Sequence, residues 1–292
     1  MGRSSLHTAQ PRILSSLNET GTILFTFDEM RRFFTLHKKS WEVATSVSFD
    51  KFLIFMVKNT KLKEHAIAFP NRLYKRYTWG RTSAYHLTMS IIRNAYFTHR
   101  SAMFINGLID TEPQDIFLNT EQRLNKYADR TLEQSRINMA FSREVRQTNN
   151  IAKFDGKKIY LLNGMYTGNL GVHTLKLRGN TLSTTNLERT LIDIAVRPIY
   201  SGGVLEVGGA FCKAKAALSI QKLAEMLGSL DYIYPYHQVI GFYLDKTGVY
   251  DRDELTIFRK PGLQYDFYLT HNMAKTAFCP EWRLHYPANF AL

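Results

Sequence analysis

Carboxylates that could act on nucleic acid occur in the second half of the chain. A metal-dependent nuclease needs an Asp and then Glu-x-Lys on one strand, because the carboxylates hold a divalent ion and the lysine helps to activate water. Asp193 and Glu206 supply the first two residue types, but Gly208 stands where the lysine is required. The pattern is incomplete, so we keep a nucleic-acid-processing enzyme such as a nuclease only as the alternative function.

A second pattern has the residue types of a nucleotide-transferring site. Gly228-Ser229 could hold a phosphate, and Asp251 and Asp253 could hold a metal ion. The gap between the two pairs is too long for one such site, and Arg252 would place a cation between the two metal ligands. We therefore expect no nucleotide transfer by these residues.

Cysteine usage and overall composition limit which other kinds of catalytic or metal site the chain could contain. Cys212 and Cys279 have no further Cys or His at metal-binding spacing, and no phosphate-binding glycine loop or nucleophile elbow occurs. We expect no metal, no cofactor, no enzymatic activity and a reducing compartment.

The N-terminus lacks a signal pattern, and the apolar run 52–57 is too short to cross a bilayer. These features predict a cytoplasmic protein without a membrane segment.

Positive charge is concentrated in the first third of the 292-residue chain. Residues 1–100 contain 16 Lys and Arg against 6 Asp and Glu, whereas the whole chain has 38 against 25. A basic field confined to one region favours a polyanion such as DNA, because lysines and arginines that neutralise phosphates release condensed counterions. A merely solvated basic surface is the alternative.

The first 82 residues predict helix, short strand, helix, helix and hairpin. Thr26 and Glu29 form a capping box before the second helix, and Ser48 caps a third helix that runs to about Lys58. Two β-prone runs, 61–69 and 72–79, flank Pro70-Asn71 and predict a hairpin. This order is that of a winged helix-turn-helix, whose third helix enters the major groove and whose wing lies along the DNA backbone.

The basic residues of this module fall on the third helix and on the predicted wing. Ser48, Asp50 and Lys51 lie in the first helical turn, which approaches the groove floor, so we expect them to reach base edges. Most of the others are expected to contact phosphates. The predicted DNA-binding residues are Lys38, Lys39, Ser48, Lys51, Lys58, Lys61, Lys63, Arg72, Lys75 and Arg76.

The third helix is apolar nearly all round. Ile54 and Phe55 add to the row that faces the core, which is more than a monomeric winged helix needs to bury. We therefore expect a second contact surface on this helix.

Residues 83–292 predict a larger, mixed α/β domain. Helices are expected within 83–107, 131–144 and 209–228, and strands at 115–119, 157–163, 171–178 and 181–184. Thr98 is the expected N-cap of a helix that stops at Gly107. His99 follows it without catalytic or metal-binding neighbours in the sequence, so a capping or packing role is expected. The aromatic tail, 234–292, is typical of core and interface.

The segment 184–207 has the clearest local signals of this domain. Thr185 and Glu188 can form a capping box ahead of an apolar row, and Arg189 and Asp193 lie four apart on one helical face, where they can pair. Pro198 and the glycines after it end the helix and turn the chain.

Three segments together resemble one protein family. They are residues 187–193 followed by Arg197-Pro198, Gly202-Gly203 and Glu206-Val207; residues 95–102 running on to 106–108; and residues 236–244. Their order and spacing are similar to those of the AbiEi family, the antitoxin and transcriptional-regulator half of type IV toxin–antitoxin, or abortive infection, systems. Thr98 stands where the family often has Ser, and Asn106 where it often has His. The family motif residues carried over to this chain are Glu188, Arg189, Asp193, Gly202, Gly203 and Glu206.

Charge and element order predict an α+β protein whose residues 1–82 form an N-terminal winged helix-turn-helix, and the resemblance implies that residues 83–292 form a C-terminal antitoxin domain. It implies an antitoxin and autorepressor in a phage-defence operon, binding operator DNA with inverted repeats upstream of that operon. Two molecules, a homodimer on DNA, would occupy two half-sites. The cognate partner would be an AbiEii-like nucleotidyltransferase toxin, countered with or without direct contact.

Overall fold

The computed structural model describes residues 5–124 and 131–292, which form two compact units. One unit comprises the chain up to Arg93 together with Ala152–Asp155, and the other comprises Asn94–Ile151 and Gly156–Leu292. Both contain helices and sheets, so the expected α+β class is confirmed. None of the described helices has the length and apolar character needed to cross a bilayer.

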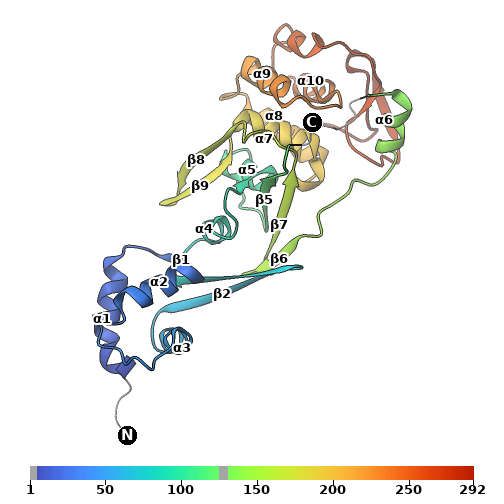
Figure 1. Ribbon diagram of the computed structural model, residues 1–292. Helices are drawn as coiled ribbons and strands as arrows, with labels where there is room; N and C mark the ends of the chain where they lie inside the picture. The colour runs from blue at the N-terminus through green and yellow to red at the C-terminus, as the bar shows by residue number, and fades with distance from the viewer. Residues whose placement is uncertain (1–4, 125–130) are drawn as a thin grey trace. The chain divides into compact units, whose positions relative to one another are not determined.

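The N-terminal unit has a winged-helix-like arrangement of helices and a small antiparallel sheet (Figure 1). Strand β3 pairs with β1 on one side and with β2 on the other. The elements in chain order are α1 (Ser5–Glu19), β1 (Leu24–Thr26), α2 (Phe27–His37), α3 (Phe49–Asn59), β2 (Leu62–Phe69), β3 (Arg72–Trp79) and α4 (Ala84–Met89).

Local caps set where helices α2 and α3 begin. Thr26 Oγ1 accepts from Glu29 N (3.2 Å) and Glu29 Oε2 accepts from Thr26 N (2.7 Å), so the predicted capping box is confirmed. Ser48 Oγ accepts from Lys51 N (3.3 Å) and caps α3. Trp41 and Phe52, both almost fully buried, belong to the aromatic core that these helices close.

The β2–β3 hairpin is paired along its whole length. Its register runs from Leu62 opposite Trp79 to Phe69 opposite Arg72, which leaves Pro70-Asn71 as a two-residue turn. The hairpin expected around these two residues is therefore confirmed.

The C-terminal unit is built on a mixed sheet in the order β7-β5-β4-β9-β8. Strand β5 is parallel to β7 and antiparallel to β4, and β9 is parallel to β4 and antiparallel to β8. The elements of this unit up to α7 are β4 (Tyr96–Phe97), α5 (His99–Ile105), β5 (Asp115–Glu121), α6 (Gln134–Phe141), β7 (Lys157–Gly164), β8 (Val172–Leu177), β9 (Asn180–Thr185) and α7 (Leu187–Val196). Strand β6 (Ile151–Phe154) falls, except for Ile151, in the segment that belongs to the N-terminal unit.

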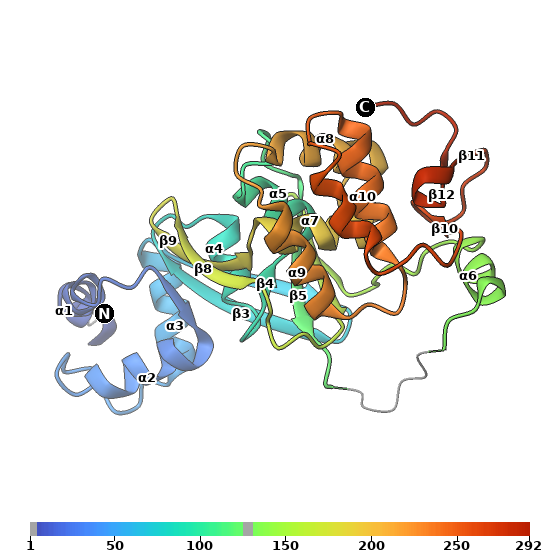
Figure 2. The same cartoon turned by 90° about the horizontal axis from the view of Figure 1, so that it is seen from above.

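Helix α7 lies among the remaining helices of this unit, as Figures 1 and 2 show in the yellow-to-red part of the chain. A single helix expected within 209–228 is instead two helices, because Ser219 caps a new start after α8. The elements after α7 are Pro198–Tyr200 (3-10), α8 (Val204–Ala214), α9 (Ile220–Leu230), α10 (Tyr236–Thr247), Glu254–Arg259 (3-10), β10 (Phe267–Tyr268), β11 (Thr276–Cys279), Pro280–Trp282 (3-10) and β12 (Leu284–Pro287).

Aromatic residues of the C-terminal tail fill the core of this unit. Phe242, Tyr243, Phe267 and Trp282 are almost fully buried there. The Trp282 ring packs so closely on helix α10 that a Cβ added at Gly241 would collide with it. The expectation that the tail belongs to the core is confirmed.

Candidate functional site

Helix α7 starts one residue later than the sequence predicts. Its N-cap is Asn186, whose Oδ1 accepts from Arg189 N (2.9 Å). The expected capping box of Thr185 and Glu188 is wrong, because Thr185 ends strand β9 and its buried hydroxyl contacts that of Thr190 (2.7 Å). This start places Arg189 on the buried side of the helix.

Arg189 and Asp193 form a buried ion pair. Arg189 Nε lies 2.7 Å from Asp193 Oδ1, and the residues are only 4% and 7% exposed, so the predicted pairing is confirmed in an environment with little water. Arg189 NH1 also donates to Leu170 O (2.7 Å). Burial alone would lower the pKa of Arg189, but the charge and hydrogen bond of Asp193, together with Tyr96 and Tyr232, outweigh it and hold that pKa above its ordinary value. The pair is therefore ionised and locally neutral.

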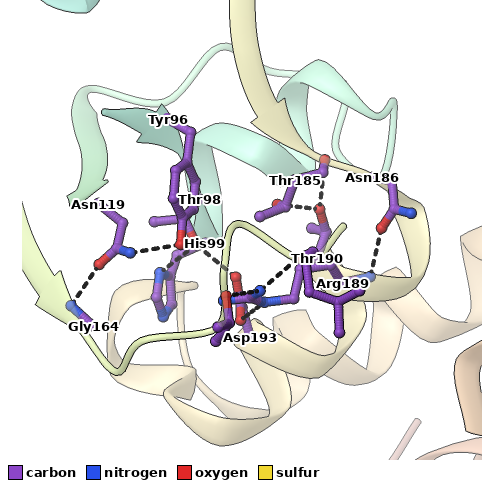
Figure 3. A network of polar contacts seen from close by, with 12 residues as sticks. Tyr96, Thr98, His99, Asn119, Gly164, Thr185, Asn186, Arg189, Thr190 and Asp193 are labelled. Atoms are coloured by element: carbon purple, nitrogen blue, oxygen red, sulfur yellow. Dashed lines mark hydrogen bonds and ion pairs between the residues drawn. The ribbon is translucent and has the colours of Figure 1, made fainter. Parts of the chain in front are cut away.

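The second oxygen of Asp193 connects the pair to helix α5. Thr98 Oγ1 donates to Asp193 Oδ2 (2.9 Å), and His99 Nδ1 lies 3.0 Å from the same hydroxyl (Figure 3). A hydroxyl has one proton, which here goes to the carboxylate, so His99 Nδ1–H must be the donor. Thr98 is the N-cap residue, as expected, but makes no side-chain cap bond; its oxygen accepts from the His99 ring instead of from a backbone N–H.

His99 is the unusual residue of this network. It is buried and non-glycine, yet its φ is +50°, in the left-handed region, and its ring packs edge-on against Tyr200 at 5.4 Å. Burial lowers its pKa to about 4, although the Asp193 charge acts in the opposite direction. The ring is therefore neutral at pH 7, with its proton on Nδ1. Its other nitrogen, Nε2, is buried without a hydrogen-bond partner in the part of the chain that the structure describes.

A second polar branch links three strands of the sheet beside His99. Asn119 Oδ1 accepts from Gly164 N (2.9 Å), and Asn119 Nδ2 donates to Tyr96 Oη (2.7 Å) (Figure 3). A Cβ added at Gly164 would lie 2.9 Å from Asn119 Oδ1, so a glycine there lets the two strands share this amide. The amide is thereby fixed in one orientation.

The two branches line one cavity of about 310 Å³ within the C-terminal unit. His99, Asn119 and the Arg189–Asp193 pair form part of its wall, together with Arg197 and Tyr232. Burial and the nearby Asp193 charge raise the pKa of Tyr232, so this phenol is neutral. Asn119 and Tyr232 carry no local signal in the sequence and were not predicted, and Arg197 was predicted only as part of a motif. Such a wall can bind a small polar molecule.

Glu206, another of the motif residues, forms a separate ion pair with Arg100. Glu206 Oε1 lies 2.7 Å from Arg100 NH2, and Gly202, at φ +87°, lies beneath the carboxylate. A Cβ at Gly202 would collide with the Glu206 carboxylate, so the first glycine of the motif is required by this contact. Gly203 precedes α8 at φ +94° with open space around it, and Glu188 is half-buried in the first turn of α7.

The carboxylates considered for chemistry have other partners. Asp193 pairs with Arg189 and Glu206 with Arg100, so each is already neutralised by its own arginine. Among residues 5–124 and 131–292, no three His, Cys, Asp or Glu side chains are grouped as metal ligands.

Most of the predicted DNA-binding lysines and arginines are exposed on α3 and the β2–β3 hairpin. Several rest on neighbouring side chains: Lys61 lies over the Trp79 ring at 4.5 Å, and Lys75 pairs with Glu64 at 2.9 Å. The exposed residues of the predicted set are Lys39, Ser48, Lys51, Lys58, Lys61, Lys63, Arg72 and Lys75.

Lys38 and Arg76 differ from the rest of the predicted set. Lys38 Nζ donates to the carbonyls of Thr45 (2.8 Å) and Val47 (2.7 Å), so it holds the loop between α2 and α3. Arg76 is 8% exposed, and its guanidinium donates to Ser90 O (2.5 Å), Ser90 Oγ and Ile91 O. Both cations already satisfy backbone carbonyls, which makes them structural ties within this unit.

The outer face of α3 mixes charge with exposed apolar residues. Phe55 is buried, but Ile54 is 68% exposed. Ile54 lies between Lys51 and Lys58 along the helix, at helical spacing from both. This part of the helix therefore presents both cations and an aliphatic side chain to solvent.

Comparison with known proteins supports the fold. Neither a protein-family model nor a curated protein sequence gives a significant match to this chain. Among solved structures, the crystal structure of the RV2827C protein from Mycobacterium tuberculosis is similar, with a TM-score of 0.61 over 96% of this chain and 91% of that one. The two sequences are 14% identical, so the likeness concerns the fold alone.

Proposed function

We propose that this protein is a DNA-binding transcriptional regulator and antitoxin of the AbiEi type. The observation that carries the DNA-binding part is helix α3, which presents an exposed first turn with Ser48 and Lys51 beside a fully paired, basic hairpin. A helix of this kind enters the major groove with its N-terminal residues near base edges, and a wing contacts the flanking backbone.

The residues divide into base readers and phosphate contacts. Ser48, Asp50 and Lys51 are proposed for base edges, because they lie in the first turn of α3. Lys39, Lys58, Lys63 and Arg72 are proposed for phosphates, since they are exposed on the same unit. Lys38 and Arg76 are left out of the proposed interface, because their donors are engaged by backbone carbonyls.

The test is a mobility-shift assay of the purified protein on its own upstream DNA and on a scrambled duplex. We expect preference for the upstream DNA, weakened at least about tenfold in Lys51→Glu or Lys63→Glu, because a repelled phosphate replaces an attracted one. Lys222→Glu, an exposed lysine of the C-terminal unit, is the charge-matched control and should bind like wild type. Equal, weak binding to both duplexes would contradict the proposal.

The antitoxin part rests on the resemblance of the three motif segments to the AbiEi family. We propose that the C-terminal unit counters an AbiEii-like nucleotidyltransferase toxin encoded beside it, and that two molecules repress the operon from inverted half-sites. Several of the motif residues support this unit structurally, since Arg189, Asp193 and Glu206 all lie in ion pairs.

Co-expression with the neighbouring toxin candidate separates the two activities. The double variant Lys51→Glu/Lys63→Glu should lose operator binding yet still relieve growth arrest, because both changes lie in the N-terminal unit. Failure of wild-type protein to relieve the arrest would contradict the antitoxin part while leaving the regulator part open to its own test. Metal-dependent DNA cleavage lost in Asp193→Ala or Glu206→Ala would favour the nuclease alternative instead.

A further inference from the structure

The cavity in the C-terminal unit has a polar atom that the fold does not use. His99 is 8% exposed and lines the cavity, and its Nε2 has no hydrogen-bond partner in residues 5–124 and 131–292. Figure 3 shows the ring between the Asn119–Gly164 branch and Asp193. Burying a polar atom without a hydrogen-bond partner destabilises the folded state. The unpaired Nε2 therefore indicates that a ligand group binds there.

The proton positions decide what that group must bring. Thr98 gives its hydroxyl proton to Asp193, and His99 gives its Nδ1 proton to Thr98, so Nε2 has a free lone pair. A ligand must therefore present an N–H or O–H donor to it. A bare anion cannot, because Nε2 accepts a hydrogen bond.

The surroundings of His99 hold its ring in one orientation. Its φ of +50° lies in the left-handed region, which eight other described non-glycine residues also occupy, so the backbone by itself does not mark a site. The Thr98 hydroxyl and the edge-on contact with Tyr200 hold the ring in place. The acceptor is thus fixed before a ligand arrives.

The rest of the wall supplies a cation, amides and a flat ring. Arg197 has no carboxylate partner among the described residues, and NH1 donates only a long hydrogen bond to Arg146 O (3.3 Å). The Arg189–Asp193 pair is neutral as a unit, so Arg197 gives the wall a positive charge. Asn119 and Gln122 add side-chain amides, and Tyr232 adds an aromatic ring.

We propose that this cavity binds a nucleoside monophosphate. The base would donate an N–H to His99 Nε2 and meet the amides along its edge, with the Tyr232 ring beside it. The phosphate would pair with Arg197, whose planar guanidinium matches phosphate oxygens. The cavity volume of about 310 Å³ lies at the small end of the range for small-molecule sites, roughly 300–1,000 Å³.

The site lies wholly within the C-terminal unit, so the inference does not depend on DNA binding by the N-terminal unit. Its test is calorimetric titration of the full-length protein with AMP, GMP, CMP and UMP. Inorganic phosphate and the four uncharged nucleosides separate binding of the anion alone from recognition of the whole nucleotide. We expect saturable binding of one molecule of at least one nucleotide per chain, with weaker binding of its nucleoside and of phosphate.

Variants assign the binding to this cavity. His99→Asn keeps a donor toward Thr98 and tolerates the left-handed backbone but lacks Nε2, whereas His99→Gln restores an acceptor near the Nε2 position. We expect about tenfold or greater loss of affinity in His99→Asn and in Arg197→Gln, and partial recovery in His99→Gln. Arg143→Gln, an exposed arginine outside the cavity wall, is the control for lost charge and should bind like wild type.

A spectroscopic measurement checks the contact itself. The ¹⁵N resonance of His99 Nε2 should move on saturation with the nucleotide, because the free lone pair becomes a hydrogen-bond acceptor, and it should not move with phosphate alone. Three results would overturn the inference: no binding at millimolar nucleotide, equal binding by wild type, His99→Asn and Arg197→Gln, or binding abolished by Lys51→Glu, which would place the nucleotide on the N-terminal unit.

Discussion

Thr98 Oγ1 donates a hydrogen bond to Asp193 Oδ2 at 2.9 Å, although the two residues lie 95 positions apart. The other oxygen of the same carboxylate pairs with Arg189 at 2.7 Å. One buried side chain thus joins the start of α5 to the middle of α7, and it also fixes the proton position on His99 through Thr98.

Removing the Thr98 hydroxyl should destabilise the C-terminal unit. Thr98→Val keeps the shape but leaves Asp193 Oδ2 and His99 Nδ1 without their partner, so we expect a loss of about 1–3 kcal/mol in the free energy of unfolding. Thr98→Ser keeps the hydroxyl and should cost less than about 1 kcal/mol. Urea unfolding followed by circular dichroism measures both. Equal losses in the two variants would show that the methyl group matters and the hydroxyl does not.

The Arg189–Asp193 pair should be strongly coupled. Arg189→Met or Asp193→Asn alone leaves one buried group without its counter-charge and should cost about 3–5 kcal/mol. The double variant should cost clearly less than the sum of the two single losses, because it removes both charges. A double-mutant cycle in urea gives the coupling energy. Simple additivity would mean that the two charges stabilise the fold independently.

The two motif glycines should respond differently to alanine. Gly203→Ala adds only a backbone cost, about 1–3 kcal/mol, because φ +94° with ψ 177° is a region that almost only glycine occupies and nothing lies within contact distance. Gly202→Ala also places alanine at a positive φ, +87°, and adds a collision with the Glu206 carboxylate, so it should be the more destabilising change. Combining Gly202→Ala with Glu206→Ala should recover part of the difference. Thermal unfolding of the four proteins would refute this account if the two alanine variants melted together.

His99 should make stability depend on acid pH. Burial lowers its pKa from 6.5 to about 4 in the folded protein, so between these values the unfolded chain binds a proton that the folded chain does not. The contribution of neutral His99 to the free energy of unfolding is therefore fully present above pH 6.5. It decreases by roughly 3 kcal/mol in total as the pH drops to about 4. His99→Asn cannot titrate, so the difference in unfolding free energy between wild type and variant should shrink over this range. A difference independent of pH would contradict a buried neutral His99.

Predictions from the sequence were most accurate for features that depend on residues close together in the chain. The Thr26–Glu29 capping box, the Ser48 cap and the hairpin around Pro70-Asn71 depend on residues a few positions apart, and the structure confirms all three. The Arg189–Asp193 pair was also predictable, because a spacing of four places both side chains on one helical face.

Long-range contacts explain what the sequence did not reveal. Thr185 looked like a cap, but its place at the end of a buried strand gives its hydroxyl to Thr190. Arg76 looked like a surface cation, yet the fold of α4 brings the carbonyls of Ser90 and Ile91 to it. The cavity beside His99 is likewise assembled from distant strands and helices, and its members carry no shared spacing in the sequence.

Binding to upstream DNA across a salt series tests the central proposal most directly. For the wild type we expect preference for the upstream duplex over a scrambled one, with a steep loss of affinity as salt is added, because displaced counterions drive phosphate binding. In Lys63→Gln the slope of log affinity against log salt should fall by about one, as one phosphate contact is lost. Equal and weak binding to both duplexes, with a slope that Lys63→Gln leaves unchanged, would contradict a winged-helix regulator.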